Sequence, residues 1–226
     1  HIVYANLIGG QDELVFDGHS LVVAPDGTFI AKGNAFEEEM IYADLKINPK
    51  QAKQNSKKSI NSSIKTYPVS TKSSSKNKPV TPKRKIRKLN PTEEVFKALV
   101  LGTSDYMKKN GFGKATIGLS GGIDSALTAV IAVKAIGSEN VVGITMPSNY
   151  SSRGSIDDSE TLAKNLGMRV ISLPITDVML SYDKILSKVF ENLPSDVTEE
   201  NLQARIRGAI MMALIWNSIG PMMLTI

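Results

Sequence analysis

The sequence predicts an α/β fold, in which a parallel sheet with helices on both faces follows a β-rich segment. Two observations lead to this prediction. From residue 90 onward, short apolar runs alternate with helical patterns, which is typical of parallel strands joined by right-handed crossovers. Before residue 48, turn residues separate short β-like runs. A strongly basic stretch lies between the two parts, so we expect domains at 1–47 and 91–226 with a linker at 48–90.

The β-rich segment reads as a series of short strands separated by turns. We expect strands at residues 2–5, 14–16, 20–24, 29–31 and 40–47. The run Pro25-Asp26-Gly27-Thr28 predicts a hairpin turn between two of them. So few residues in hairpins bury too little surface to be stable alone. We therefore expect the segment to be the last strands of a larger β-sandwich enzyme.

The basic segment, residues 48–90, has an unusual composition. It holds 13 of the 27 basic residues of the chain and none of the 22 acidic residues. The rest of the chain therefore has 14 basic and 22 acidic residues. It is also rich in serine, asparagine and threonine, which favours a disordered linker. The run 83–88 would suit nucleic-acid phosphates. Only one aromatic residue, Tyr67, is interleaved for base stacking, so a solvated tether is favoured and no nucleic-acid partner is expected.

The composition narrows the class of protein. The chain has no cysteine, which excludes disulfides, cysteine metal sites and a cysteine nucleophile within it. It has no apolar run of about eighteen residues, so we expect no membrane span and a cytoplasmic location. The chain begins with His1 rather than methionine, and its first residues resemble the interior of a protein. We therefore expect a piece of a longer enzyme.

The second part of the chain contains several helix and strand boundaries. Asn90-Pro91-Thr92-Glu93 is typical of a helix start, with a capping residue, a proline in the first turn and a glutamate at the third position. Asn110-Gly111 predicts the end of that helix. We then expect strands at 115–119, 141–145 and 168–173, and helices at 126–136, 157–166 and from residue 199 onward, the last capped by Thr198. Ligands of such folds bind at the carboxyl ends of the strands.

The most informative stretch is Ser120-Gly121-Gly122-Ile123-Asp124-Ser125, between the first of these strands and its helix. Glycines let the backbone turn tightly and approach a ligand without a Cβ clash. A helix N-terminus attracts an anion through its free N–H groups and its dipole. The carboxylate of Asp124 would repel a phosphate unless a divalent cation binds both groups. The stretch therefore predicts a phosphate site with a metal, and the alternative is an ordinary glycine turn before a helix.

Two further stretches are candidates for the same site. Residues 146–159 follow the second strand at the sheet edge that carries the glycine loop, where an adenine would lie if phosphates occupied that loop. An ordinary polar loop is the equal alternative. Residues 200–208 begin a helix on which Asn201 and Arg205 share one face. Arginines between apolar positions either pair with acidic neighbours or clamp an anionic ligand.

In combination, these stretches resemble the glutamine-dependent NAD(+) synthetase family. S-G-G-x-D-S resembles the pyrophosphate loop of the ATP pyrophosphatases, which have an adenine nucleotide alpha hydrolase-like fold. M-P-S-x-Y-S-S-x-G-S-x-x-D-S at 146–159 and E-N-L-Q-A-R-x-R-G at 200–208 are similar to the next two signatures of the family. N-L-I-G-G-Q-D-E-L-V-F-D-G-H-S at 6–20 resembles the C-terminal part of its nitrilase-like α/β/β/α glutaminase domain.

The resemblance implies an activity and a set of site residues. It implies ATP-dependent adenylation of deamido-NAD, release of pyrophosphate, and amidation by ammonia from glutamine to give NAD, AMP and glutamate. It also implies a homo-oligomer that uses ATP and Mg2+. The residues implied to bind ATP are Gly118, Leu119, Ser120, Gly121, Gly122, Ile123, Asp124 and Ser125. Asp124 would also bind the magnesium ion, and Asn201 and Arg205 would contact deamido-NAD.

The chain departs from the family pattern in two respects. The glutaminase nucleophile of the family is a cysteine, which is absent here, and its glutamate and lysine partners would lie outside this chain. The chain ends at Leu224-Thr225-Ile226, before the T-G-N-K-S-E loop of the family, so we expect this piece alone to be inactive. Two other functions stay open. One is another ATP pyrophosphatase amidotransferase, such as a GMP synthetase, and the other is a truncated product that acts at most as a binding module.

Overall fold

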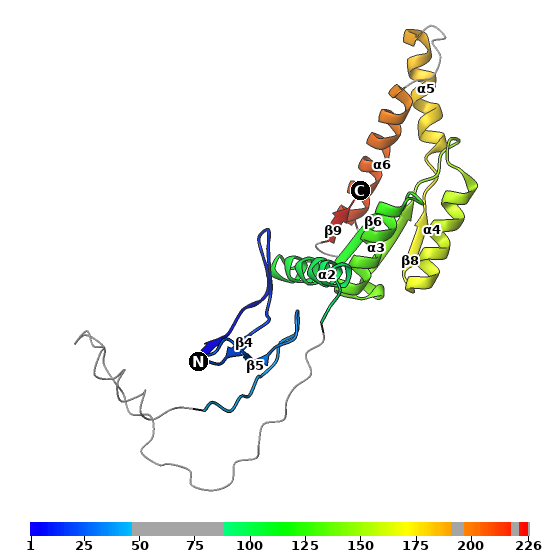
Figure 1. The fold of residues 1–226 in the computed structure, drawn as a ribbon. Coiled ribbons are helices and arrows are strands. Elements are labelled where there is room, and N and C mark those ends of the chain that lie inside the picture. Colours follow the sequence, from blue (N-terminus) through cyan, green and yellow to red (C-terminus); the bar gives the residue numbers. More distant parts are fainter. Residues whose placement is uncertain (47–87, 191–196, 218–221, 226) are drawn as a thin grey trace, which may run out of the picture. The chain divides into compact units, whose positions relative to one another are not determined.

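The computed structural model describes residues 1–46, 88–190, 197–217 and 222–225 (Figure 1). The chain divides into two compact units. One comprises His1–Ile8 and Asp17–Leu89, and the other comprises Gly9–Phe16 and Asn90–Ile226. The predicted linker, residues 48–90, lies outside the described residues except for positions 88–90. The domain boundaries at residues 47 and 91 stay a prediction.

The first unit is built on an antiparallel sheet. Three strands pair in the order β1-β4-β5, namely Ile2–Tyr4, Leu21–Val23 and Phe29–Lys32. The predicted turn lies between β4 and β5, where the N–H group of Ala24 donates to the carbonyl oxygen of Thr28 at 2.8 Å. The carboxylate of Asp26 accepts from the N–H group of Thr28 at 3.0 Å. These bonds confirm the predicted hairpin turn.

Our prediction of a strand at residues 40–47 is wrong for residues 40–46, which the structure describes. Residues 40–46 have no regular secondary structure, and Ile47 lies outside the described residues. The side chains of Met40 and Tyr42 are exposed. A strand needs the backbone groups of a partner strand on at least one edge. None of the described strands pairs with this stretch, so its β-like composition alone does not produce a strand.

A short hairpin consists of β2 (Ile8–Gln11) and β3 (Leu14–Asp17). Most of it, Gly9–Phe16, belongs to the second compact unit, although the sequence places it in the β-rich segment. Among the described residues, β2 and β3 pair with each other and with no strand of the parallel sheet. The β-rich segment therefore does not extend that sheet, as predicted.

The second unit contains a parallel sheet with the strand order β8-β7-β6-β9. Its strands are Lys114–Gly118 (β6), Val141–Thr145 (β7), Arg169–Ser172 (β8) and Met222–Thr225 (β9). The chain proceeds outward from β6 to β8 and then returns to the other side of β6. The strand order thus changes direction beside β6, and ligands of open α/β sheets bind at such a point.

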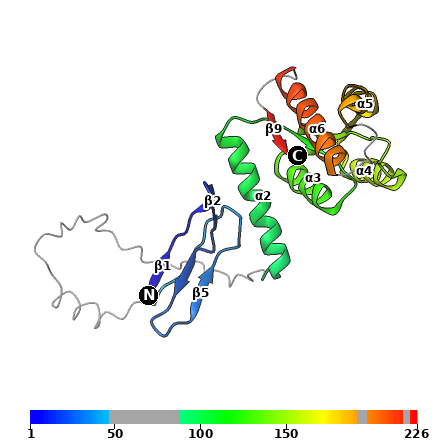
Figure 2. The ribbon, with the colours of Figure 1, turned by 90° about the horizontal axis from the view of Figure 1, so that it is seen from above.

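Helices cover both faces of this sheet, α3 and α4 on one and α5 and α6 on the other (Figure 2). The described helices of the unit are Pro91–Lys109 (α2), Ile123–Ile136 (α3), Arg153–Leu166 (α4), Thr176–Phe190 (α5) and Val197–Asn217 (α6). The predicted cap of α2 is present, because the Asn90 side chain accepts from the N–H group of Glu93 at 2.8 Å. The sequence analysis missed α5. No described helix is both long enough and apolar enough to cross a membrane.

Each face of the sheet buries its own apolar core. Ile117 and Val141 pack with α3 and α4 on one face. Ile144 packs with α5 and α6 on the other face, together with Ile206 and Met211. Val141 and Ile144 come from the same strand, β7, and lie on opposite faces because successive side chains of a strand alternate. Coverage of both faces is typical of parallel sheets and confirms the predicted three-layer fold.

Candidate functional site

The glycine-rich loop joins β6, which ends at Gly118, to α3, which begins at Ile123. The buried Leu119 anchors the start of the loop, since its N–H group donates to the carbonyl oxygen of Ile144 at 2.8 Å. Gly121 has a φ angle of +79°, in the left-handed region that favours glycine. A Cβ atom there would lie 2.6 Å from the Cα atom of Ser155. The loop therefore needs glycine at position 121 for both its backbone conformation and its contact with α4.

Two serine side chains hold the loop in shape. The hydroxyl groups of Ser120 and Ser125 lie 3.1 Å apart. The N–H group of Gly122 donates to the Ser120 hydroxyl at 3.2 Å, and the Ser125 hydroxyl donates to the Gly122 carbonyl at 3.0 Å. Bonds of this kind between nearby side chains and backbone fix a turn. The loop's own hydrogen bonds thus fix its turn.

The N-terminus of α3 is open toward a ligand. Its capping residue is Gly122, and no side chain makes a capping hydrogen bond there. The first N–H groups of a helix lack intrahelical partners and carry partial positive charge. The side chain of Asp124 is exposed in the first turn. This arrangement fits an anion at the helix end with a cation beside it.

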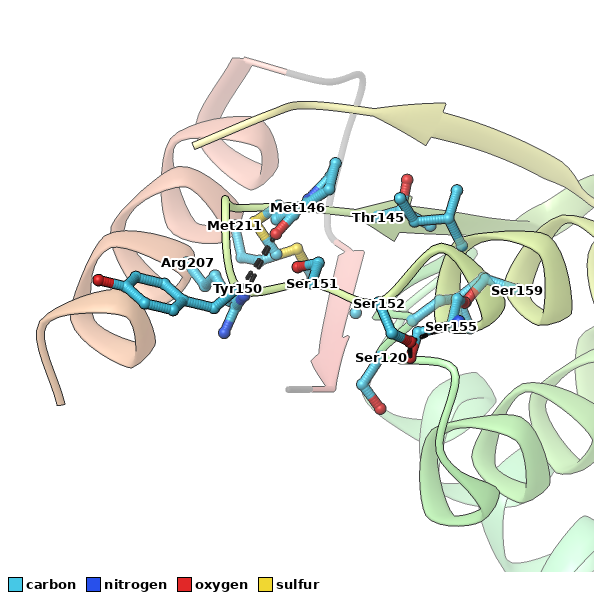
Figure 3. Close-up of a pocket in the computed structure, with 14 residues that line it drawn as sticks. Ser120, Thr145, Met146, Tyr150, Ser151, Ser152, Ser155, Ser159, Arg207 and Met211 are labelled. Carbon is cyan, nitrogen blue, oxygen red and sulfur yellow. Dashed lines mark hydrogen bonds between the residues drawn. The ribbon is translucent and has the colours of Figure 1, made fainter. Parts of the chain in front are cut away.

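A cavity of 440 Å³ lies beside the loop, at the carboxyl ends of β6 and β7. Its walls come from these two strand ends, the segment after β7, the start of α4 and one face of α6. Figure 3 shows Ser120, Ser152 and Ser155 at one end of the cavity and Tyr150 with Arg207 at the other. The apolar side chains of Met146 and Met211 also line it. The cavity therefore combines hydroxyl donors at one end with an apolar floor and a cation at the other.

The wall contributed by α6 rests on Gln203 and Arg207, which are four residues apart. Gln203 is 7% exposed, and its Oε1 atom accepts from the Ser148 hydroxyl at 2.8 Å and from Arg207 Nη2 at 3.2 Å. Arg207 Nη2 also donates to the Met146 carbonyl at 3.3 Å. Partial burial lowers the pKa of the Arg207 guanidinium from its ordinary value, yet arginine keeps its charge at neutral pH. The network holds a cation against the cavity.

The structure brings only some of the predicted site residues to this cavity. Gly118, Leu119 and Ser120 line it. The remaining loop positions, Gly121, Gly122, Ile123, Asp124 and Ser125, form the adjoining turn and the first turn of α3. Asn201 and Arg205 are exposed and do not line the cavity.

The sequence analysis missed Gln203 and Arg207, and a signal for them existed. They lie on the side of α6 that also carries the buried Ile206 and Met211, because positions three or four apart share a helix face. Asn201 and Arg205 are two residues away from them, which places that pair nearly on the opposite side of the helix. The apolar periodicity of α6 therefore identified the face that packs toward the sheet.

The described residues contain no group of three or more histidine, cysteine, aspartate or glutamate side chains able to hold a metal ion. A site built by the protein alone is thus not seen in this part of the chain. Magnesium, however, is commonly held by one or two carboxylates together with substrate phosphates. No described side chain donates a hydrogen bond to the Asp124 carboxylate. The donor set therefore fits a magnesium ion that arrives with a nucleotide.

These features define a class of protein: a three-layer α/β domain with a glycine-rich loop at a helix N-terminus and a cavity where the strand order changes direction. The family model for NAD synthase matches residues 95–223, and the chain belongs to this family. The model for carbon–nitrogen hydrolases matches residues 1–52. The hydrolase match overlaps the first residues of the basic segment, whereas the NAD synthase match begins after that segment.

Relatives with the same two parts are known. The chain is 47% identical to the glutamine-dependent NAD(+) synthetase of Thermotoga maritima, over 99% of this chain and 39% of that protein. It is 41% identical to that of Synechocystis, over 99% of this chain and 35% of the relative. The structure of the Acinetobacter baumannii enzyme in complex with ADP superposes with a TM-score of 0.69 at 34% identity, covering 94% of this chain and 35% of the other. The chain thus spans between 35% and 39% of the length of these relatives.

Proposed function

We propose that this chain supplies the ATP-binding part of a glutamine-dependent NAD(+) synthetase. The observation that carries the proposal is the open N-terminus of α3 behind a loop held by serine hydroxyls, next to a cavity of 440 Å³. Family membership and the ADP complex of the Acinetobacter relative support a nucleotide as its ligand. The alternative of a GMP synthetase is not favoured, because the segment before residue 53 matches a carbon–nitrogen hydrolase.

The phosphates would occupy the serine end of the cavity. There, the N–H groups at the start of α3 and the hydroxyl of Ser120 can donate to phosphate oxygens, while the Ser125 hydroxyl holds the loop through the Gly122 carbonyl. Asp124 would hold a magnesium ion, and this ion would neutralise charge on the pyrophosphate as it leaves. The adenine would lie toward the other end, where Met146 and Met211 offer an apolar surface. Arg207 can stack on the base or donate to its acceptor atoms.

The chemical step would begin when a carboxylate oxygen of deamido-NAD attacks the α-phosphorus of ATP and pyrophosphate leaves. Ammonia then attacks the acyl carbon, AMP leaves, and the amide of NAD forms. The preformed loop supplies donors aimed at the charge that develops on the leaving group, which lowers the barrier most when the donors need no reorganisation. The hydrolase-like segment belongs to the part that would release ammonia from glutamine.

Asn201 and Arg205 are proposed to contact deamido-NAD from the exposed side of α6. We also propose that the enzyme is a homo-oligomer. Supporting this, an exposed apolar stripe runs along α5 at helical spacing and comprises Val178, Tyr182, Ile185 and Val189. Ile185 is 70% exposed, and such a stripe is typical of a helix that packs against another surface. A second copy of the chain is the occupant that we propose.

The direct test is NAD formation from deamido-NAD, ATP and ammonium by an enzyme of the relatives' length that contains this chain. Ammonium replaces glutamine so that the synthetase step is measured alone. We expect NAD, AMP and pyrophosphate in equal amounts. Xanthosine monophosphate in place of deamido-NAD should give no amidated product. Amidation of xanthosine monophosphate and none of deamido-NAD would overturn the proposal.

A further inference from the structure

The hairpin of β2 and β3 lies against helix α2, within the second compact unit. Its residues fall in the segment that matches a carbon–nitrogen hydrolase, whereas the part of α2 that it contacts falls in the segment that matches NAD synthase. A piece of one sequence family is thus folded as part of the other. The atoms at this contact show how closely the two fit.

Both backbone polar groups of Gly10 are bound by side chains of α2. The N–H group of Gly10 donates to Asp105 Oδ2 at 2.8 Å, and the Lys109 ammonium donates to the Gly10 carbonyl oxygen. Asp105 and Lys109 are four residues apart, so they share one face of the helix. Gly10 is buried, and a buried backbone group without a partner is costly. The pair therefore serves as the hydrogen-bonding partner that a further strand would otherwise provide.

Glycines permit the close approach of the hairpin and α2. A Cβ atom on Gly10 would lie 3.1 Å from the Cα atom of Gly102, and one on Gly102 would lie 3.2 Å from a methyl group of Val15. At Gly9, whose φ angle is +138°, a Cβ atom would lie 2.7 Å from the Asp105 carboxylate. The two surfaces are thus complementary in shape as well as in charge, because side chains at these glycines would push them apart.

We propose that Gly102, Asp105 and Lys109 form a docking surface on α2 for the hairpin Gly9–Phe16, and that this contact couples the hydrolase part to the synthetase part. The coupling rests on the proposed function, whereas the docking itself does not. Packing of α2 against its own core does not explain why Asp105 and Lys109 both bind the backbone of Gly10. Their placement is explained if the hairpin must stay on the helix while ammonia is made in one part and consumed in the other.

The test compares two nitrogen sources in an enzyme of the relatives' length that contains this chain. Asp105→Leu and Lys109→Ala should lower glutamine-supported NAD formation by roughly tenfold, as expected for the loss of a charged hydrogen bond. Ammonium-supported NAD formation should stay within about twofold of the unchanged enzyme, since the nucleotide site is intact. Asp105→Asn keeps an acceptor oxygen and should restore most of the glutamine-supported rate.

Lys108→Ala is the matched control, because Lys108 has the same charge as its neighbour Lys109 and, among the described residues, makes no side-chain hydrogen bond to the hairpin. It should leave both rates unchanged. Hydrogen exchange of the peptide covering Gly9 and Gly10 gives an independent reading, and it should be faster in Asp105→Leu than in Lys108→Ala.

The outcomes separate the steps of the proposal. Equal loss of both activities would mean that the pair only stabilises the synthetase part, and unchanged activities would mean that no coupling passes through it. Either result overturns the coupling. If the unchanged enzyme has no ammonium-supported activity, the proposed function is refuted, and hydrogen exchange still tests the docking. Unchanged exchange in Asp105→Leu overturns the docking surface.

Discussion

Substitution of Gly121 by alanine should destabilise the glycine-rich loop by more than the conformational cost of a left-handed alanine alone. Two costs act at this position. Alanine in the left-handed region costs about 1–2 kcal/mol, and Gly121 has a φ angle of +79°. The new Cβ atom would also lie 2.6 Å from both the Cα atom and the carbonyl oxygen of Ser155. These are backbone atoms at the start of α4, so they cannot rotate away, and overpacking of this kind costs about 1–3 kcal/mol more.

Gly111 provides a matched control for the first of these costs. Its φ angle is +73°, and no atom lies within 4 Å of the position where its Cβ would stand. Gly111→Ala should therefore carry only the conformational cost, about 1–2 kcal/mol. The difference between the two variants isolates the contact with Ser155. If the loop moves to relieve that contact, the Ser120 and Ser125 hydroxyls move with it and nucleotide affinity falls.

The assay is thermal unfolding of both variants together with calorimetric titration of ADP and magnesium. Gly121→Ala should have a melting temperature several degrees below that of Gly111→Ala, since about 1 kcal/mol corresponds to roughly 2–8 °C for domains of this size. Its affinity for ADP should be at least about tenfold weaker, whereas Gly111→Ala should bind ADP as the unchanged chain does. Equal melting temperatures and equal affinities for the two variants would refute the steric argument.

Three other predictions test the site and the first unit. Asp124→Asn should lower ammonium-supported turnover about a hundredfold, or about 3 kcal/mol, with little change in stability; near-normal turnover at saturating magnesium and ATP would refute the metal assignment. Arg207→Met should weaken ADP binding about tenfold, and Arg205→Met, on the exposed side of α6, should not change it; the reverse order would refute the role proposed for Arg207. Hydrogen bonds from the Thr28 N–H group and hydroxyl lower the pKa of Asp26. The contribution of these bonds to the stability of the folded chain is therefore complete above the pKa of Asp26 in the unfolded chain, about 4, and is lost as pH falls through its pKa in the folded chain. The carboxyl titration of Asp26 by NMR should shift to higher pH in Thr28→Val, and an unchanged midpoint would contradict this cause.

Features set by local chemistry were predictable from the sequence. The cap at Asn90 and the turn at Asp26 depend on atoms a few residues away, and the glycine loop depends on its own serines. The strand at residues 141–145 was predicted with the bounds that the structure gives it. Apolar strands between helical patterns have little choice of partner in a parallel sheet, so the layers followed from the same pattern.

Features set by distant partners were not predictable in this way. Residues 40–46 have a β-like composition but no strand to pair with. The hairpin contains ordinary turn residues, and nothing in its own sequence indicates that Gly10 is bound by Asp105, 95 positions away. In both cases, a residue far along the chain decides the outcome. Gln203 and Arg207 were missed for a different reason, because Asn201 and Arg205 were assigned from the family resemblance, although the apolar periodicity of α6 indicated the other face.

The two faces of α6 limit how the proposed substrates can meet. Arg207, which is hydrogen-bonded to Gln203, lines the cavity where we propose that the nucleotide binds, while Asn201 and Arg205 lie on the exposed side of the same helix. If the exposed pair bound the nicotinate carboxylate itself, that carboxylate would lie across α6 from an α-phosphate in the cavity of the same copy, and the reaction would then need the nucleotide of a second copy. A pair that binds another part of the dinucleotide carries no such requirement. A monomer that retains full ammonium-supported turnover would therefore refute both the oligomer proposal and binding of the reacting carboxylate by this pair.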